Sequence, residues 1–259
     1  MTAAIHPTAV VAPGAALADG VEVGPYAVIG EGVEIGRGTR IGPHVVIEGP
    51  TRVGEENRIF QFASVGADPQ DKKYRGEASR LEIGDRNVIR ECVTLHRGTA
   101  QDQAVTRIGH DNLFMAYAHV AHDCVIGNQC VLANNATLGG HVHLDDWVIM
   151  GGLSAVHQFC KVGAHAFIAN NAAVTRDVPP FVMAVGQPAE AHSINAEGLK
   201  RRGFTPEQIR NIRRAFRVLY RSGLKLEDAQ AQLAALAGEQ PEIRPLVEFL
   251  PQSTRSIVR

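Results

Sequence analysis

The chain has 259 residues with 26 basic and 27 acidic side chains, so its formal net charge is −1. Such a balance argues against a general nucleic-acid binder, unless basic charge is gathered locally. Hydrophobic residues make up 45% of the chain but aromatic residues only 5%, so we expect a core packed mainly with aliphatic side chains.

The N-terminal segment and the cysteines indicate the compartment. No apolar run approaches the ~18 residues that span a bilayer, so we expect no membrane insertion. The first residues include His6 and Pro7 and lack a basic flank, unlike a secretory signal. The four cysteines contain no Cys-x-x-Cys pair, which argues against a disulfide framework or a thiolate metal site. We therefore expect a cytoplasmic protein.

An apolar anchor recurs at every sixth position along most of the chain. The first run extends from Ile5 to Val65 and resumes from Ile83 to Leu95. A second run, shifted by one residue, extends from Ile108 to Val174, and all 26 anchor positions are apolar. Small or β-branched residues usually stand four positions after an anchor, and glycine often follows it directly. This hexapeptide pattern predicts a parallel β-helix over residues 1–190, in which three hexapeptides form one triangular coil and coils stack ~4.8 Å apart.

Two polar segments interrupt the repeat, at residues 66–82 and 99–107. Loops on a rigid repeat are more often functional than structural.

The repeat also determines where the cysteines lie, because three of the four occupy the small position after an anchor. Cys124, Cys130 and Cys160 are therefore expected to be small buried hydrophobes rather than catalytic thiols.

Histidines gather on one face of the predicted prism. Anchors three hexapeptides apart share a face, and three such anchors are each followed closely by a histidine. These histidines are His122, His141 and His157. We expect them in a column with one coil between neighbours, with His119 at the corner that enters the face and Asp123 beside His122.

Two chemistries fit such a column. Three neutral imidazoles can bind Zn²⁺, as in the carbonic anhydrases built on this fold. Alternatively, one imidazole is a general base oriented by a carboxylate, and the others hold the substrate. The zinc interpretation is weakened because no His-x₄-His pair accompanies the column. A purely structural rod, such as an ice-binding β-helix, would need regular flat rows of one residue type, which these faces lack.

A small helical subdomain is predicted over residues 191–259. Thr205 and Pro206 begin a helix, with Gln208 completing a capping box, and Gly223 ends it. A second helix is expected at about 226–237, and a third after Pro241. Residues 199–225 contain nine basic side chains and one acidic side chain, a net of +8 that leaves −9 on the rest of the chain. This excess favours an acidic partner or a phosphorylated ligand.

Seven segments together resemble the UDP-N-acetylglucosamine O-acyltransferase family, which catalyses the first step of lipid A synthesis. They are QFASVG (61–66), QDKKY (70–74), IGDRNVIRECVTLHRGT (83–99), AHVAHDCVIGN (118–128), LANNATLGGHV (132–142), AVHQFCKVGAH (155–165) and NAEGLKRRGF (195–204). The resemblance runs from about Ile5 to Arg259 and includes both loops. It implies a left-handed β-helix and a homotrimer whose sites lie between adjacent prisms.

The resemblance also implies roles for individual residues. His122 is expected to be the general base, Asp123 its orienting partner, and the Gly140 N–H the donor to the oxyanion. The residues expected to bind the sugar nucleotide or line its cleft are Gln70, Asp71, Lys73, His119, His141, His157 and Gln158. Those expected at the nucleotide end are Asn195, Glu197, Arg201 and Arg202.

The implied reaction transfers an (R)-3-hydroxyacyl group from acyl carrier protein to the 3-hydroxyl of UDP-GlcNAc. The thioester is already activated, so no metal or redox cofactor is expected, and the basic helix is expected to dock acyl carrier protein. The family position that sets acyl length matches Asn170, where glycine leaves the groove open for longer chains. Asn170 lies about 2.7 coils after His122, so we expect a preference for about ten to twelve carbons.

Overall fold

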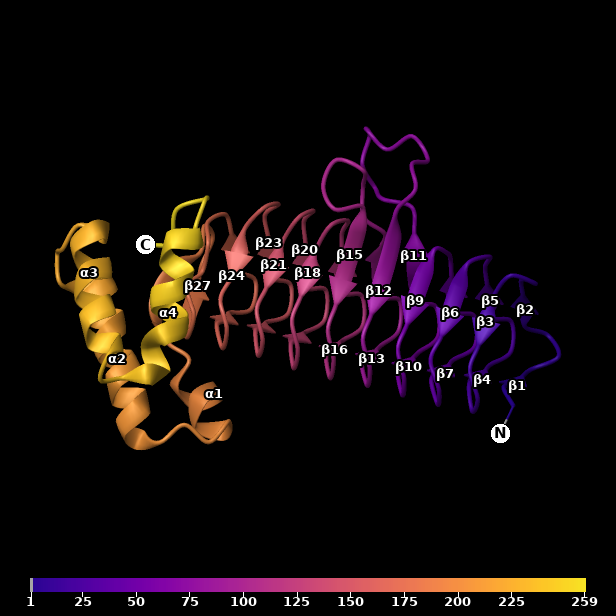
Figure 1. Ribbon diagram of the computed structural model, residues 1–259, viewed down its shortest axis with the longest axis horizontal. Helices are drawn as coiled ribbons and strands as arrows, with labels where there is room; N and C mark the ends of the chain where they lie inside the picture. Colours follow the sequence, from indigo (N-terminus) through magenta and orange to yellow (C-terminus); the bar gives the residue numbers. More distant parts are fainter. Residues whose placement is uncertain (1) are drawn as a thin grey trace.

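The computed structural model describes residues 2–259 as a triangular β-helical prism with helices at its C-terminal end (Figure 1). Three parallel sheets form the prism faces, and successive strands along the chain pass from sheet A to sheet B to sheet C. We name the corners between them the A–B, B–C and C–A edges, in chain order. The predicted β-helix is confirmed.

The strands are short, most of them two residues long, as a hexapeptide repeat requires. Sheet A contains β1 (Ala4–Ile5), β4 (Glu22–Val23), β7 (Arg40–Ile41), β10 (Arg58–Ile59), β13 (Val88–Ile89), β16 (Leu113–Phe114), β19 (Val131–Leu132), β22 (Ile149–Met150), β25 (Phe167–Ile168), β27 (Val182–Val185) and β28 (Glu190–Ile194). Sheet B contains β2 (Val10–Val11), β5 (Val28–Ile29), β8 (Val46–Ile47), β11 (Ser64–Ala67), β14 (Thr94–His96), β17 (His119–Val120), β20 (Thr137–Leu138), β23 (Ala155–Val156) and β26 (Ala173–Val174). Sheet C contains β3 (Ala16–Leu17), β6 (Val33–Ile35), β9 (Thr51–Val53), β12 (Arg80–Ile83), β15 (Val105–Ile108), β18 (Val125–Ile126), β21 (His143–Leu144) and β24 (Lys161–Val162).

The strand register shows where the two loops enter. Regular neighbours are three hexapeptides apart, as in the pairing of Val10 with Val28. Arg58 pairs with Val88, so the first loop lengthens its coil by two whole hexapeptides and keeps the anchor phase. Val88 pairs with Leu113, so the second loop adds a hexapeptide and one further position, which shifts the phase. The loops themselves span 68–79 and 97–104, somewhat shorter than expected.

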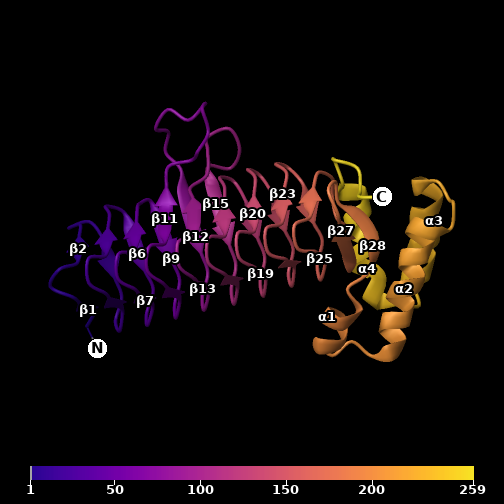
Figure 2. The ribbon, with the colours of Figure 1, turned by 180° about the vertical axis from the view of Figure 1, so that it is seen from behind.

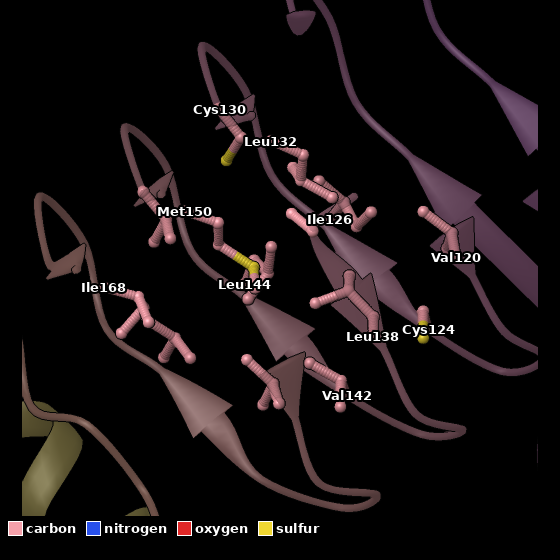
Figure 3. Close-up of a cluster of buried hydrophobic side chains, with 14 of the residues drawn as sticks. Val120, Cys124, Ile126, Cys130, Leu132, Leu138, Val142, Leu144, Met150 and Ile168 are labelled. Atoms are coloured by element: carbon pink, nitrogen blue, oxygen red, sulfur yellow. The ribbon is translucent and has the colours of Figure 1, made fainter. Parts of the chain in front are cut away.

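The anchors fill the prism with aliphatic side chains, as Figure 3 shows for its C-terminal half. Leu132, Leu138 and Met150 are fully buried. The cysteines in the small positions are buried too, and burial raises the pKa of Cys124 and Cys130 to about 12. Their thiols therefore stay protonated near neutral pH, which agrees with a packing role.

A ladder of buried asparagines runs inside the C–A edge. Asn87 donates from Nδ2 to Asn57 Oδ1 (3.0 Å) and to the Gly109 carbonyl (3.0 Å). Its Oδ1 accepts from the backbone N–H (3.0 Å) and Nδ2 (2.9 Å) of Asn112. Asn112 Oδ1 in turn accepts from the N–H of Cys130 (2.7 Å). These amides satisfy corner backbone groups that would otherwise be buried without partners.

Asn87→Ala is expected to lower the free energy of unfolding by about 2–4 kcal/mol, because it orphans the Asn112 N–H and the Gly109 carbonyl in a dry interior. The thermal midpoint should fall by about 5–10 °C, measured by scanning calorimetry. Asn134→Ala, at an exposed corner position without a side-chain hydrogen bond in residues 2–259, is the matched control. A shift no larger than that of the control would contradict the importance of the ladder.

The C-terminal subdomain packs on the end of the prism (Figure 2). The hairpin of β27 and β28 extends sheet A, and four helices follow: α1 (Ala196–Arg201), α2 (Pro206–Arg221), α3 (Leu226–Ala237) and α4 (Arg244–Phe249). The capping box of Thr205 and Gln208 is confirmed, and so are the two helices after it. Short 3₁₀ turns, η1 (Pro241–Ile243) and η2 (Leu250–Gln252), flank α4.

The boundary expected at residue 190 coincides with the start of β28, which pairs antiparallel with β27 and so joins the prism to the helices. The C-terminal tail also returns to the prism, where Asp177 pairs with Ile257. Across residues 2–259, no helix combines the length and apolarity needed to span a membrane.

Candidate active site

Both loops leave the B–C edge of the prism, and the predicted general base follows on the same edge. The first loop joins β11 to β12, the second joins β14 to β15, and His122 lies between β17 and β18 on the next coil. Figure 1 shows the two loops projecting together from this edge. Residues from segments far apart in the sequence therefore meet around His122.

His122 and Asp123 form a hydrogen-bonded dyad. His122 Nδ1 lies 2.9 Å from Asp123 Oδ2, and the two side chains are 13% and 1% exposed. A carboxylate beside Nδ1 makes that nitrogen the donor, which leaves the lone pair on Nε2. This is the arrangement of an oriented general base.

The second loop holds the Asp123 carboxylate in place. Thr99 donates from its backbone N–H to Oδ1 (2.9 Å) and from its hydroxyl to Oδ2 (2.6 Å). Burial alone would raise the pKa of Asp123, but the hydrogen bonds from His122 and Thr99 outweigh it and lower the pKa. Asp123 therefore stays ionised near neutral pH and stabilises a protonated His122.

Gly140 lies directly against the His122 ring, one coil further along. A Cβ atom at this position would stand 2.6 Å from His122 Cε1 and 2.8 Å from Nε2. Only glycine leaves room for the ring in this orientation. Among the described residues 2–259 the Gly140 N–H has no hydrogen-bond partner, whereas its neighbours Gly139 and His141 donate to other coils. The expected oxyanion donor is thus free and adjacent to the expected base.

His122, His141 and His157 follow one another on successive coils of the B–C edge, as expected, but their three side chains do not form one cluster. The His122 and His141 rings are perpendicular with centroids 5.0 Å apart, and His141 stacks on Phe159 at 4.3 Å. His157 is exposed, and its Nδ1 contacts the carbonyl of Gln158 (3.2 Å). The three histidines stand two, three and one positions after their anchors, so their side chains leave the corner at different places. Only the rings of His122 and His141 therefore meet.

Positive-φ corner positions account for the stacking that does occur. Asp123 (φ 59°) and His141 (φ 61°) occupy equivalent corner positions on successive coils, followed by Phe159 (φ 67°) on the next. Left-handed backbone costs about 1–2 kcal/mol in a residue with a Cβ. Corner hydrogen bonds, such as His141 N–H to the His122 carbonyl (3.0 Å), offset that strain.

His119 lies in strand β17 rather than at a corner, which corrects the sequence-based placement. Its Nδ1 is 2.7 Å from the hydroxyl of Thr94, and burial lowers its pKa. The ring meets His96 edge-on at 5.0 Å. Burial lowers the pKa of His96 to about 4, so this imidazole is neutral at pH 7. His96 was not predicted as a site residue, since nothing in the repeat distinguishes it.

The first loop carries Gln70, Asp71 and Lys73 near the B–C edge but not in contact with His122. Asp71 Oδ1 accepts from the backbone N–H of Lys73 (2.9 Å), which shapes the turn at its tip. The buried Arg97 fastens the root of this loop: it donates to the carbonyl of Gly66 (2.7 Å) and pairs with Asp68.

The residues expected at the nucleotide end lie elsewhere on the chain. Asn195 is buried, caps α1, and donates from Nδ2 to the His165 carbonyl (3.0 Å) on the C–A edge. Arg202 bonds His165 Nδ1 (3.1 Å) and lies over the Trp147 ring at 5.1 Å. Glu197 and Arg201 are exposed on α1. Within one chain this group does not join the His122 cluster.

Gln158 and Asn170 lie on two different edges of the prism. Gln158 is exposed on the B–C edge, one coil after Gly140, with its carbonyl accepting from Arg255 (3.3 Å). Asn170 stands on the A–B edge, where its Oδ1 accepts from the Gly152 N–H (3.0 Å). Asn170 and His122 therefore lie on different edges of the prism within one chain, because their separation is not a whole number of coils.

Three side chains around the general base could in principle hold a metal ion. Potential ligand atoms of His122, Asp123 and His141 lie within 4.8 Å of one another. However, both oxygens of Asp123 already accept hydrogen bonds from Thr99, and Oδ2 faces His122 Nδ1. The hydrogen-bond pattern fits a His–Asp dyad better than a metal ligand set.

Known proteins similar to this chain match it over nearly its full length. A family model described as "Udp N-acetylglucosamine O-acyltransferase; Domain 2" matches residues 177–258, and one for bacterial transferase hexapeptide repeats matches residues 15–49 and 106–140. The acyl-[acyl-carrier-protein]–UDP-N-acetylglucosamine O-acyltransferase of Thiobacillus denitrificans is 60% identical over 257 residues, covering 99% of this chain and 100% of that protein.

Solved structures agree with this assignment. The Francisella novicida UDP-N-acetylglucosamine acyltransferase matches with a TM-score of 0.96 at 46% identity, covering 98% of this chain and 94% of that one. LpxA from Acinetobacter baumannii matches with a TM-score of 0.96 at 47% identity, covering 98% and 99%. The expected left-handed β-helix is confirmed by these neighbours. With full-length identity, fold and site motifs in agreement, the chain belongs to the acyl-[acyl-carrier-protein]–UDP-N-acetylglucosamine O-acyltransferase family.

Proposed function

We propose that the protein transfers an (R)-3-hydroxyacyl group from acyl carrier protein to the 3-hydroxyl of the GlcNAc of UDP-GlcNAc, the first step of lipid A biosynthesis, in the cytoplasm. The observation that carries the mechanism is the His122–Asp123 dyad with Gly140 against its ring. The names of the full-length relatives support the substrates.

In the proposed mechanism, His122 Nε2 accepts the proton of the sugar hydroxyl as its oxygen attacks the thioester carbonyl. The free Gly140 N–H donates to the resulting oxyanion. Collapse of this intermediate forms the ester and releases the phosphopantetheine thiolate, which takes the proton back from His122. Asp123 stabilises the transient imidazolium. The thioester is an activated donor, so this route needs neither a metal nor a redox cofactor.

The test is an assay of the purified protein with UDP-GlcNAc and a panel of (R)-3-hydroxyacyl carrier-protein thioesters of different lengths. Formation of the 3-O-acylated sugar nucleotide is the expected result. Absence of product with every donor would contradict the proposal.

We further propose that the protein is a homotrimer whose active sites lie between neighbouring copies. Within residues 2–259, the strands of sheet B contain no Lys, Arg, Asp or Glu, whereas sheets A and C carry outward charges such as Arg40 and Arg52. An uncharged, partly apolar face is suited to burial against another copy. Such packing would bring the A–B or C–A edge of one copy towards the B–C edge of another, where residues that lie apart in one chain can form one cleft.

The basic face of α2 is the proposed docking surface for acyl carrier protein. Arg213, Arg217 and Arg221 are exposed at successive turns of the helix and line a groove with His192 of β28. Their positive charge suits an acidic partner and would accelerate encounter.

Reversal of two of these charges, Arg213→Glu with Arg217→Glu, is expected to raise KM for the acyl donor about tenfold and to flatten its salt dependence. KM for UDP-GlcNAc should stay unchanged. Steady-state kinetics at several salt concentrations measures both effects. Reversal of Arg37 and Arg52, on distant coils, makes the same change in net charge and serves as the control. Equal effects on both substrates would instead indicate damage to the fold or to the nucleotide site.

Asn170 is proposed to limit acyl length from a neighbouring copy, with a preference near ten to twelve carbons. Asn170→Gly removes bulk and an amide from the end of the groove, so the preferred chain should lengthen by two or more carbons. A donor panel with wild type and variant measures this shift, and KM for UDP-GlcNAc is the control. An unchanged donor profile would assign Asn170 only to its hydrogen bond with Gly152.

A further inference from the structure

The second loop places a carboxylate on the histidine next to the general base. Asp102 Oδ2 lies 2.8 Å from His141 Nδ1, although the residues are 39 positions apart in the chain. The same pairing joins His122 Nδ1 to Asp123 Oδ2 at 2.9 Å. The site therefore contains two histidine–carboxylate dyads with perpendicular imidazole rings, 5.0 Å apart.

His141 has little freedom to turn while Asp102 is in place. Its ring stacks on Phe159 with an interplanar angle of 7°, and His122 meets it at 87°. Its side chain is only 12% exposed. Because Asp102 faces Nδ1, that nitrogen is the donor, and Nε2 remains as the ring atom that can bind a ligand.

The two carboxylates are held in different ways. Asp123 is buried and fixed by two hydrogen bonds from Thr99. The Asp102 side chain is 37% exposed and, within residues 2–259, His141 is its only hydrogen-bond partner. The contact of Asp102 with His141 therefore depends on the conformation of the 97–104 loop, whose root is fastened by Thr99.

The neighbouring imidazoles suggest which substrate His141 contacts. His122 must reach a hydroxyl of the acceptor, and the His141 ring is in contact with the His122 ring. The hydroxyls and the amide of the sugar can donate to or accept from an imidazole nitrogen. Because one sugar hydroxyl must reach His122, the neighbouring polar groups of the same sugar are the nearest partners for His141.

We propose that Asp102 is a positioning residue: it fixes the ring orientation and tautomer of His141, so that His141 Nε2 holds the UDP-sugar acceptor beside His122. This inference rests on the proposed acyl transfer. It assigns the second loop a role in acceptor binding, in addition to its support of Asp123.

Asp102→Ala is expected to raise KM for UDP-GlcNAc about tenfold and to change kcat by less than about threefold, because the lost interaction acts on binding. Asp102→Asn keeps an acceptor oxygen without its charge, so its KM should fall between those of the wild type and the alanine variant. Gln101→Ala is the matched control, since Gln101 is the exposed neighbour in the same loop and has no hydrogen bond in the described residues 2–259. Its KM should equal that of the wild type.

A double-mutant cycle separates positioning from a general effect on the loop. In a His141→Ala background, Asp102→Ala should cause no further increase in KM. A second tenfold increase there would overturn the proposal, and so would equal KM values for Asp102→Ala and Gln101→Ala in the parent enzyme.

A measurement independent of turnover is ¹⁵N NMR of the histidine rings. His141 should carry its proton on Nδ1 in the wild type, and Asp102→Ala should abolish this single tautomer. An unchanged His141 signal would overturn the proposal. A wild-type protein that fails to acylate UDP-GlcNAc would contradict the proposed function instead, while the tautomer experiment would still decide the role of Asp102.

Discussion

His122→Ala is expected to lower kcat by a factor of about 10² or more while the chain stays folded. The variant loses the imidazole that packs against Gly140 and has its Nδ1 on the buried Asp123. General-base catalysis contributes about 10²–10⁴-fold, and binding of both substrates survives its loss, so a residual rate should remain. Single-turnover and steady-state kinetics measure the effect, with the thermal midpoint as the check on folding.

Variants at the other histidines are expected to affect KM rather than kcat. His141→Ala and His157→Ala should act mainly through KM, and the exposed His157 should have the smaller effect. Comparable losses of kcat at all three positions, together with stoichiometric zinc by elemental analysis, would favour the metal interpretation. Full activity in the presence of a chelator would count against it.

Gly140→Ala is expected to lower kcat by about 10²-fold without loss of the fold. The new Cβ would stand 2.6 Å from His122 Cε1, so the ring must rotate and break its 2.9 Å contact with Asp123. A displacement of about 1 Å at a reacting group can cost about 10²-fold in rate. The measurement is kcat at saturating concentrations of both substrates.

Gly152→Ala is the matched control for this substitution. Gly152 stands at the equivalent corner position on the A–B edge, two residues after its anchor, and a Cβ there meets only the Asn134 carbonyl at 3.5 Å. This variant should keep the wild-type kcat. A Gly140→Ala enzyme as active as Gly152→Ala would show that the His122 ring can move without consequence for the reaction.

The repeat made most of the fold predictable from the sequence. A six-residue period specifies strand, corner and buried anchor at once, so the prism and the positions of both loops followed from counting. The helix starting at Thr205 was equally clear, because its capping box is local. Helix α1 was missed, since six residues are too few for an apolar period and its Asn195 cap resembles any other turn residue.

Counting hexapeptides did not predict side-chain contacts that depend on the exact position of a residue within its coil. His122, His141 and His157 share a face by their anchors, yet they occupy different corner positions, and only the first two rings meet. Asn170 was placed by axial distance alone, although position around the prism decides which edge a residue occupies. Thr99 and Asp102 were not identified, because a loop without periodicity gives no sign of the side chains it contacts.

The stacking of coils around His122 has a consequence for how the enzyme loses activity. The dyad depends on Thr99 from the preceding coil, while the ring rests on Gly140 from the following one, so three consecutive turns of the solenoid must be in register. In a quasi-one-dimensional protein each repeat contacts only its neighbours, and fraying starts at an end. The terminal coil, where Ile5 is 46% exposed, can therefore unravel while the chemistry continues. Catalytic rate followed through a denaturant titration would then report the integrity of the coils around His122, independently of the N-terminal coil.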